Sequence, residues 1–151
     1  MSLSKIKIQK TALNLIGHFD SEAKVEIETV EEVYRLNIES ELAPMLIGRR
    51  GQNLQALEHV LRLMIAKEAE EFLPLSLDIA GYKVMREKEI TEIAKELAQK
   101  VLTSGEEDIL PPMNSFERRL VHMALAEIEG IETDSEGEEP YRKIIIRRID
   151  K

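Results

Sequence analysis

The sequence predicts an α+β protein that is built from two small modules. Two segments in the first third, 24–30 and 33–40, alternate apolar and charged residues with the period of a half-buried strand. Longer segments such as 52–70 and 83–103 instead repeat apolar residues every three or four positions, which is the period of a helix. Apolar residues make up 43% of the 151-residue chain and Trp is absent, so the core is expected to be aliphatic.

The first module, residues 1–81, is expected to begin with a helix and two strands. Apolar Ile6, Leu13 and Ile16 predict a helix over 4–17 that ends at Gly17. The segments 24–30 and 33–40 predict two strands. Only two glutamates separate them, which indicates a tight turn.

The same module is expected to continue with a short helix, a turn, a long helix and a third strand. Residues 42–47 form the short helix, which has Pro44 near its start and is broken by Gly48. Apolar positions 54, 57, 61 and 64 or 65 form one stripe, and this stripe predicts the long helix. Alternation at positions 75, 77 and 79 predicts the strand.

The second module, residues 82–151, is expected to hold two helices and a small sheet. Ile90, Ile93, Leu97 and Val101 predict a helix over 83–103 with one buried face. The Pro-containing connection that follows allows at most a short strand at 108–110. Residues 114 and 117 have the spacing of a capping box and predict a helix to about residue 129, which ends before glycine 130. A strand, a polar turn and a strand over 143–148 complete the module.

The composition excludes several classes of site. The chain has no cysteine, so it has no disulfide or thiolate ligand, and its three histidines lack metal-site spacing. No phosphate-binding loop or nucleophile motif is present, so we expect no enzyme, metal or cofactor. The N-terminus lacks a signal-peptide pattern, and no run reaches the ~18 apolar residues of a membrane helix. We therefore expect a cytoplasmic protein without direct membrane insertion.

One short segment, Gly48-Arg49-Arg50-Gly51, contrasts with the formal net charge of −8. Glycine permits backbone torsions and close approaches that a side chain would block. The helix that follows offers unpaired N–H groups and a positive dipole end, and the arginines can contact phosphate. The segment is therefore either a site for an anion or an ordinary exposed turn.

Two apolar residues flank this turn and have two open interpretations. Ile47 and Leu54 either line an apolar groove in which unstacked bases lie, or they are simply packed in the core. Leu57, Leu61 and Met64 of the same stripe are expected in the core.

The second module carries an arginine and a histidine four residues apart, Arg118 and His122. This spacing places them on one helix face. Arginine can make a forked phosphate contact, and histidine can donate to phosphate or stack on a base. The alternative is a structural pair. The acidic segment 134–139 is either a solvated loop or holds Arg118 or Arg119 in place.

Four basic residues lie near the C-terminus, namely Arg142, Lys143, Arg147 and Arg148. We expect them at a charged strand edge that resists aggregation. The alternative is that they extend a track for phosphates.

Three segments together resemble a known family. "LIGRRGQNLQALEHVLRLM" resembles the GXXG element of a type II KH domain, and "PPMNSFERRLVHMAL" with "SEGEEPYRKIII" resembles an R-three-H domain. The combination looks like the bacterial Jag, or SpoIIIJ-associated, family over about residues 20 to 150. The resemblance implies a type II KH domain over 1–81 and an R-three-H domain over 82–151. It also implies an RNA-binding regulator linked to cell-envelope and division control, or to sporulation.

The resemblance and the residue patterns together define the candidate site and partners. The expected ligand is single-stranded RNA or DNA, and a homodimer or pairing with a small KH protein is also expected. Many Jag proteins carry a further N-terminal domain, so we expect this chain to be a short form. The alternative function is a protein-interaction adaptor with little nucleic-acid affinity. The candidate nucleic-acid-binding residues are Ile47, Gly48, Arg49, Arg50, Gly51, Leu54, Arg118, Arg119, His122 and Arg142.

Overall fold

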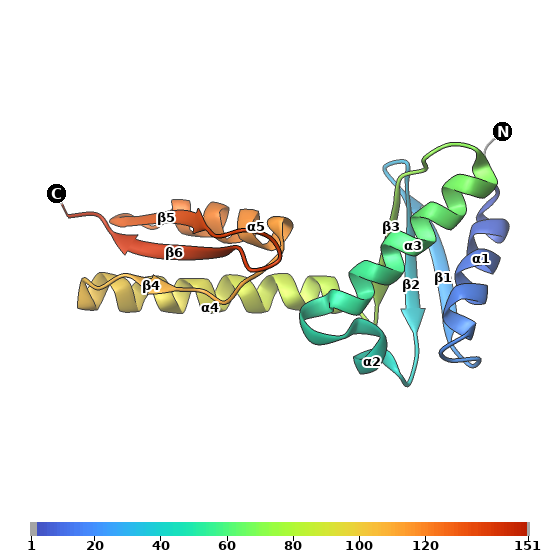
Figure 1. The fold of residues 1–151 in the computed structure, drawn as a ribbon, viewed down its shortest axis with the longest axis horizontal. Coiled ribbons are helices and arrows are strands. Elements are labelled where there is room, and N and C mark those ends of the chain that lie inside the picture. Colours follow the sequence, from blue (N-terminus) through green and yellow to red (C-terminus); the bar gives the residue numbers. More distant parts are fainter. Residues whose placement is uncertain (1–2, 151) are drawn as a thin grey trace. The chain divides into compact units, whose positions relative to one another are not determined.

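The computed structural model describes residues 3–150 and divides the chain into two compact units (Figure 1). Unit 1 ends at Lys83 and unit 2 begins at Val84. Each unit has its own three-stranded sheet and its own aliphatic core. The predicted α+β class is therefore confirmed, and each unit is described by itself.

Unit 1 contains the predicted elements in the predicted order. They are α1 (Lys5–Gly17), β1 (Lys24–Val30), β2 (Val33–Glu39), α2 (Ala43–Ile47), α3 (Gln52–Ala69) and β3 (Leu75–Ile79). The sheet order is β1-β2-β3, with β1 antiparallel and β3 parallel to β2. Glu31 and Glu32 form the tight turn between the first two strands, and both have positive φ, as a two-residue hairpin turn requires.

The core of unit 1 lies between its sheet and helices α1 and α3. Helix α3 buries Leu54, Leu57, Leu61 and Ile65, and Met64 is only half-buried. The predicted helix over 4–17 is confirmed as α1, although the side chain of Ile6 is 67% exposed. The buried residues of α1 instead follow helical spacing back from Ile16, namely Ile16, Ala12 and Ile8.

Unit 2 packs two helices and a small sheet. Its elements are α4 (Tyr82–Ser104), whose first two residues belong to unit 1, β4 (Asp108–Ile109), α5 (Ser115–Ala126), β5 (Ile131–Glu136) and β6 (Lys143–Arg148). The sheet order is β4-β6-β5 and all pairs are antiparallel. The prediction that the basic residues of the last strand lie at a sheet edge is wrong. Strand β6 is the central strand, because it pairs with β4 on one side and with β5 on the other. Its three consecutive isoleucines, residues 144–146, are buried.

Two predicted details of the helices of unit 2 also differ. In α4 the side chain of Ile93 is 44% exposed, and the buried stripe runs through Ile90, Ala94, Ala98 and Val101. Two of the four buried residues are small alanines, so a search for large apolar residues missed this face. Helix α5 ends at Ala126, earlier than predicted. Within residues 3–150, no helix is long and apolar enough to span a bilayer.

Candidate nucleic-acid interface

The segment that joins α2 to α3 in unit 1 is a tight loop, which we call the GRRG loop (residues 48–51). Its two arginines are exposed, whereas Gly48 is half-buried and Gly51 is buried. Helix α2 ends at Gly48, which has a φ of 73° and an N–H that donates to the carbonyl of Pro44. A short 3₁₀ turn, Arg49–Gly51, follows. Within it Arg50 has a φ of 55° and Gly51 a φ of 75°. The chain therefore takes three left-handed or positive-φ residues within four positions.

Both glycines of the GRRG loop are required by their neighbours. A Cβ atom on Gly48 would lie 2.6 Å from Cγ of Asn53, whose Nδ2 donates to the carbonyl of Met45 at 2.8 Å. A Cβ atom on Gly51 would lie 2.8 Å from Cε1 of Tyr82. Both distances are shorter than a Cβ atom can approach a neighbouring carbon, so any residue other than glycine would displace its neighbour. Sequence reasoning missed Asn53 and Tyr82, because nothing in the local pattern marks a residue that packs against a glycine.

The start of α3 lies beside the loop, and the N–H of Gln52 donates to the carbonyl of Arg49. No side chain caps the helix at Gly51, and its first turn holds no acidic residue. Arg49 and Arg50 are exposed, and the side chain of Arg49 makes no hydrogen bond or ion pair with any residue between 3 and 150. An uncapped helix start beside two arginines is an environment that attracts anions.

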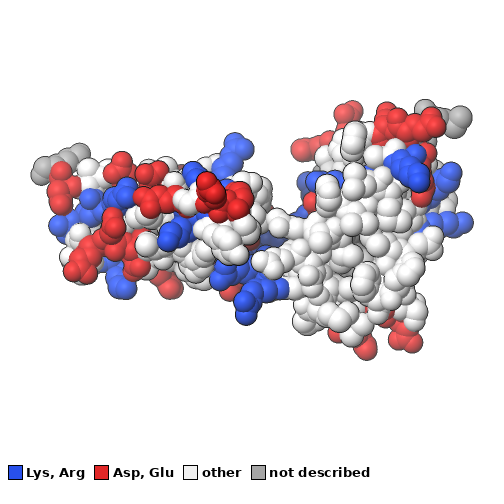
Figure 2. All heavy atoms as spheres, in the orientation of Figure 1, with Lys and Arg blue, Asp and Glu red and all other residues white. Residues whose placement is uncertain are grey.

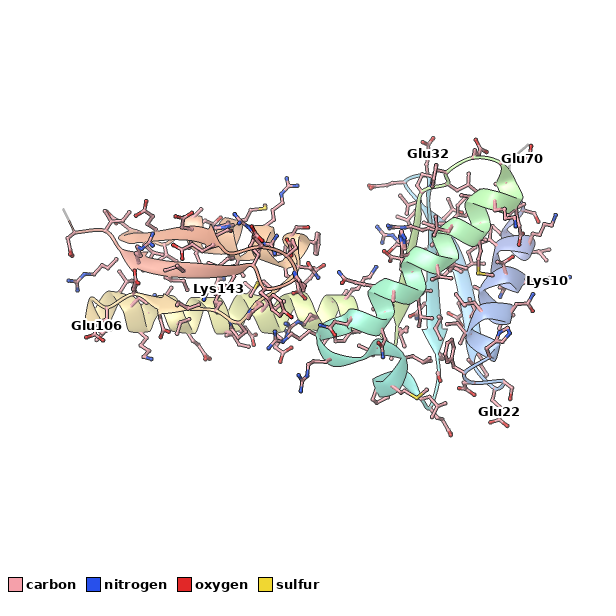
Figure 3. The ribbon with its side chains drawn as sticks, viewed as in Figure 1. Lys10, Glu22, Glu32, Glu70, Glu106 and Lys143 are labelled. Atoms are coloured by element: carbon pink, nitrogen blue, oxygen red, sulfur yellow. The ribbon has the colours of Figure 1, made fainter. Side chains whose placement is uncertain are left out.

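Acidic side chains of unit 1 gather near the far end of the same helix. One group in Figure 2 lies where α3 finishes, and Figure 3 labels Glu70 and Glu32 there. The 18 residues of α3 separate this group from the GRRG loop. The acidic overall charge of the protein is therefore not evenly distributed, and the loop is at the less acidic end of the helix.

The two apolar residues that flank the GRRG loop differ in exposure. Ile47 is half-buried against the core of unit 1, whereas Leu54 is only 2% exposed. The packing interpretation is thus favoured for Leu54, and a groove-lining role remains open for Ile47.

In unit 2, helix α5 starts with a closed set of hydrogen bonds. The side chain of Asn114 accepts from the N–H of Glu117 at 2.9 Å, and the Glu117 carboxylate accepts from the N–H of Asn114 at 3.4 Å. The predicted capping box is therefore confirmed. Glu117 also accepts from Nε of Arg86 at 3.2 Å. The N–H groups of Asn114 and Glu117 are therefore satisfied from within the protein.

Arg118 follows this start and is a buried residue, only 7% exposed. Its guanidinium donates to the carbonyl of Met113 and forms an ion pair with Glu139. The interpretation that segment 134–139 holds an arginine is confirmed for Arg118. The adjacent Arg119 is exposed and has no hydrogen-bond or ion-pair partner within residues 3–150.

His122 is held by hydroxyl groups of strand β5. Its Nδ1 lies 2.7 Å from Oγ1 of Thr133, and its Nε2 lies 2.8 Å from Oγ of Ser135. Burial lowers the pKa of His122 below its ordinary value of 6.5; Asp134 opposes this shift and Arg118 adds to it. Burial therefore favours the neutral form of His122, and both its ring nitrogens are engaged by hydroxyl groups.

The remaining basic residues of unit 2 are also largely engaged. Arg142 donates to the carbonyls of Gly137 and Ser135, at 2.6 and 3.3 Å. Three carboxylates surround the guanidinium of Arg147, those of Glu107, Asp134 and Glu136. Arg148 pairs with Asp150. These contacts favour a structural role over a phosphate track. Lys143 is half-buried at the start of β6 (Figure 3).

No cluster of His, Cys, Asp or Glu within residues 3–150 is arranged to hold a metal ion.

Comparisons with known proteins identify both units. Residues 7–76 match the family model of the KhpA/KhpB KH domain, and residues 88–148 match that of the R-three-H domain. The chain is 34% identical over 122 residues to an RNA-binding protein KhpB from Clostridium symbiosum, covering 81% of this chain and 55% of the relative. It is 30% identical over 145 residues to RNA-binding protein KhpB of Bacillus subtilis, covering 95% and 68%. It is 27% identical to RNA-binding protein KhpB of Lactiplantibacillus plantarum, and the match covers 82% of this chain and 38% of the relative. The chain therefore spans about half the length of the first of these relatives.

Proposed function

Because the chain belongs to the KhpB, or Jag, family and carries a KH domain followed by an R-three-H domain, we propose that it binds single-stranded RNA without catalysing a reaction on it. We assign the KH domain to residues 1–81 and the R-three-H domain to residues 82–151. The main contact is the GRRG loop, through its backbone and the side chains of Arg49 and Arg50.

The observation that carries this proposal is the open start of α3. Two glycines with positive φ, packed against Asn53 and Tyr82, turn the chain tightly into a helix start that no side chain caps. The two exposed arginines of the loop lie beside this helix start. A phosphate is the RNA group that such a helix start accepts. Ile47 adds half-buried apolar surface next to the loop on which a base can rest, and Leu54 supports the loop from the core.

The R-three-H domain contributes a weaker, partly indirect contact. Arg118 joins the carbonyl of Met113 to Glu139 in the β5–β6 hairpin, and His122 bonds to two hydroxyl groups of β5. The two side chains therefore position this hairpin rather than contact phosphate. Arg119 has no partner within residues 3–150 and is the side chain available for direct contact. Arg142 braces the same turn through its two carbonyl contacts.

The test is fluorescence anisotropy with a labelled, mixed-sequence single-stranded RNA at several salt concentrations. The variant Arg49→Asp/Arg50→Asp keeps both glycines, and Asp tolerates the left-handed torsion at position 50. Each lost phosphate contact should flatten the log–log salt dependence by about 0.7 on a single strand. We expect affinity to fall about tenfold or more, because two charge-assisted contacts become repulsive.

A control with the same change of charge is Lys10→Glu/Lys24→Glu. Both lysines are exposed, and Figure 3 shows Lys10 on α1, away from the segment that joins α2 to α3. This control should lose much less affinity than the loop variant. Equal losses would mean that only net charge matters, and the loop would lose its assigned role. A DNA strand of the same sequence, used as competitor, reports the choice between RNA and DNA.

A second candidate function, a protein-interaction adaptor, is favoured by exposed apolar side chains in unit 1. Val60 and Leu63 of α3 are 43% and 49% exposed, and Met45 of α2 is 52% exposed. In Figure 2 much of the visible face of unit 1 is uncharged. The partner is a second copy of the chain or a small KH protein. If wild type fails to bind RNA at low salt while Leu63→Asp abolishes self-association in light scattering, the adaptor function replaces the proposal.

The cellular role and compartment follow from the resemblance alone. We propose a cytoplasmic regulator linked to cell-envelope and division control, or to sporulation in spore formers.

A further inference from the structure

Strand β3 is an edge strand whose free side lies next to α3. It pairs with β2 on one side only. On an edge strand, the C=O of one residue and the N–H of the second residue along point outward together. In β3 these groups are the carbonyl of Leu75 and the N–H of Leu77, which we call the edge window.

Two side chains of α3 occupy the edge window. Oε2 of Glu58 accepts from the N–H of Leu77 at 2.9 Å. Nε and Nη2 of Arg62 donate to the carbonyl of Leu75 at 3.0 and 2.8 Å. The two side chains also pair with each other at 3.0 Å, at the i,i+4 spacing of one helix face. Donor and acceptor of the window are therefore both satisfied by one ion pair.

The side chains that occupy the edge window come from the helix that starts at the GRRG loop. Glu58 is six residues beyond Gln52, which corresponds to about 9 Å along the helix axis. Lys83 bonds to Glu58 at 2.6 Å and to Oγ of Ser76 at 3.1 Å, and the preceding residue, Tyr82, packs on Gly51. A loop of this type holds about four nucleotides, so a strand held there extends as far as the window.

We propose that the Glu58–Arg62 ion pair is a built-in competitor of RNA, which a nucleobase must displace to reach the edge window. The window offers one acceptor beside one donor, and the edges of unstacked bases carry the same two kinds of group side by side. Glu58 and Arg62 present those same groups from within the protein. The inference rests on the proposed RNA binding and assigns its regulation and selectivity to these two residues.

The Glu58–Arg62 ion pair blocks the edge window and, for this reason, we call it the gate. It is partly buried and makes several hydrogen bonds, unlike an exposed surface ion pair. The side chain of Glu58 is only 15% exposed and accepts from a backbone N–H, an arginine and a lysine. A bound base therefore replaces charge-assisted hydrogen bonds, which costs binding free energy. Removal of the gate should make RNA bind more tightly.

The test compares two charge-neutral double variants in the full chain, with the labelled single-stranded RNA as probe. Glu58→Ala/Arg62→Ala opens the window. Lys24→Ala/Glu39→Ala is the matched control, because these exposed residues face each other on β1 and β2 and neither has a register partner on β3. We expect about three- to tenfold tighter RNA binding for the first variant. The control should equal wild type, and thermal unfolding confirms that each variant is folded.

Inorganic polyphosphate separates base contact from electrostatics. Opening the gate also releases Lys83 from Glu58, and a freed ammonium would attract any polyanion. Tighter binding of RNA but not of polyphosphate supports the proposal. An equal gain for both polyanions overturns it, because released charge then explains the effect.

Amide hydrogen exchange at Leu77 gives a second readout. Its N–H should exchange faster in the open variant than in wild type, and RNA should restore its protection. If the variant binds RNA no more tightly, or if RNA leaves this amide unprotected, the inference is wrong although RNA binding stands. If the open variant dimerises instead, the free edge of β3 pairs with a strand of a second copy. A nucleobase is then not the group that the edge window binds, and the inference is wrong. If neither wild type nor variant binds RNA, the proposed function itself has failed.

Discussion

Helices α3 and α5 both begin next to a pair of arginines, but the two starts are built in opposite ways. At α3 no side chain caps the helix, and the arginines are exposed on a loop that two glycines hold open. At α5 a complete capping box closes the backbone, and Arg118 is buried against Met113 and Glu139. The first start leaves hydrogen-bonding capacity for a ligand, and the second uses that capacity to stabilise its own domain.

This difference teaches that a binding motif in a sequence does not identify the atoms that touch the ligand. The Arg-x-x-x-His spacing correctly predicts one helix face, yet both side chains are engaged with the β5–β6 hairpin. Their neighbour Arg119, which is not part of the spacing, is the exposed one. Each of the following predictions tests one side of the comparison.

The largest effect on stability is expected for Arg118→Ala. The change removes the guanidinium that satisfies the Met113 carbonyl and Glu139, and bonds of this charge-assisted kind contribute about 2 kcal/mol to the free energy of unfolding. Urea unfolding measures the loss. The control is Arg119→Ala, an exposed site one residue further on, where the change should be within about 0.5 kcal/mol. Equal effects at both positions would contradict the structural role of Arg118.

A somewhat smaller effect is expected for Gly51→Ala in the GRRG loop. An alanine at a φ of 75° is strained, and its Cβ atom would meet the ring of Tyr82. We expect a loss of about 1–2 kcal/mol. Gly17→Ala is the matched control, since a Cβ there meets nothing within 4 Å. A Gly51 variant as stable as the Gly17 variant would mean that the loop adapts easily.

The capping box at α5 should contribute less. Asn114→Ala removes the acceptor for the N–H of Glu117, and N-cap losses of this kind cost about 1 kcal/mol. Thermal unfolding measures this loss of stability, and Ser115→Ala, at an exposed neighbouring position, is the control. An unchanged melting temperature for Asn114→Ala would show that α5 does not depend on its closed start.

The smallest effect is a pH dependence that arises from His122. Its pKa is lower in the folded protein than its ordinary value of 6.5, so the unfolded chain binds the proton more readily. The stabilisation from neutral His122 is therefore complete above that value and is lost as pH falls through the folded pKa.

We expect wild type to lose more stability than His122→Gln between about pH 7.5 and about pH 5.5. The carboxylates whose pKa is lowered, Asp20 and Asp108, titrate below this window and affect both proteins alike. Parallel pH profiles for the two proteins would contradict the assignment to His122.

The sequence predicted the order of the elements well, because strong periodicity marks both strands of the first hairpin and the stripe of α3. It also predicted the capping box, which depends on two residues three positions apart. It failed where packing depends on small or distant residues. The alanines of α4 conceal its buried face, and the central position of β6 depends on its pairing with β4, which is remote in sequence.

The candidate site was predicted in part. The GRRG loop is a local pattern, so its position between two helices was visible from residues 46–54 alone. The partners that fix it, Asn53 and Tyr82, and the Glu58–Arg62 pair on the edge of β3 are set by tertiary contacts. No local spacing signals such contacts.

The most direct test of the central claim is an amide NMR titration of the full chain with a short single-stranded RNA. We predict that the largest early changes in amide chemical shift occur at residues 48–54, which comprise the GRRG loop and the open start of α3. Amides at the start of α5 and in the hairpin around His122 should change later and less. If the first and largest changes instead lie in unit 2 while residues 48–54 remain unaffected, the claim that the open helix start is the main RNA contact is wrong.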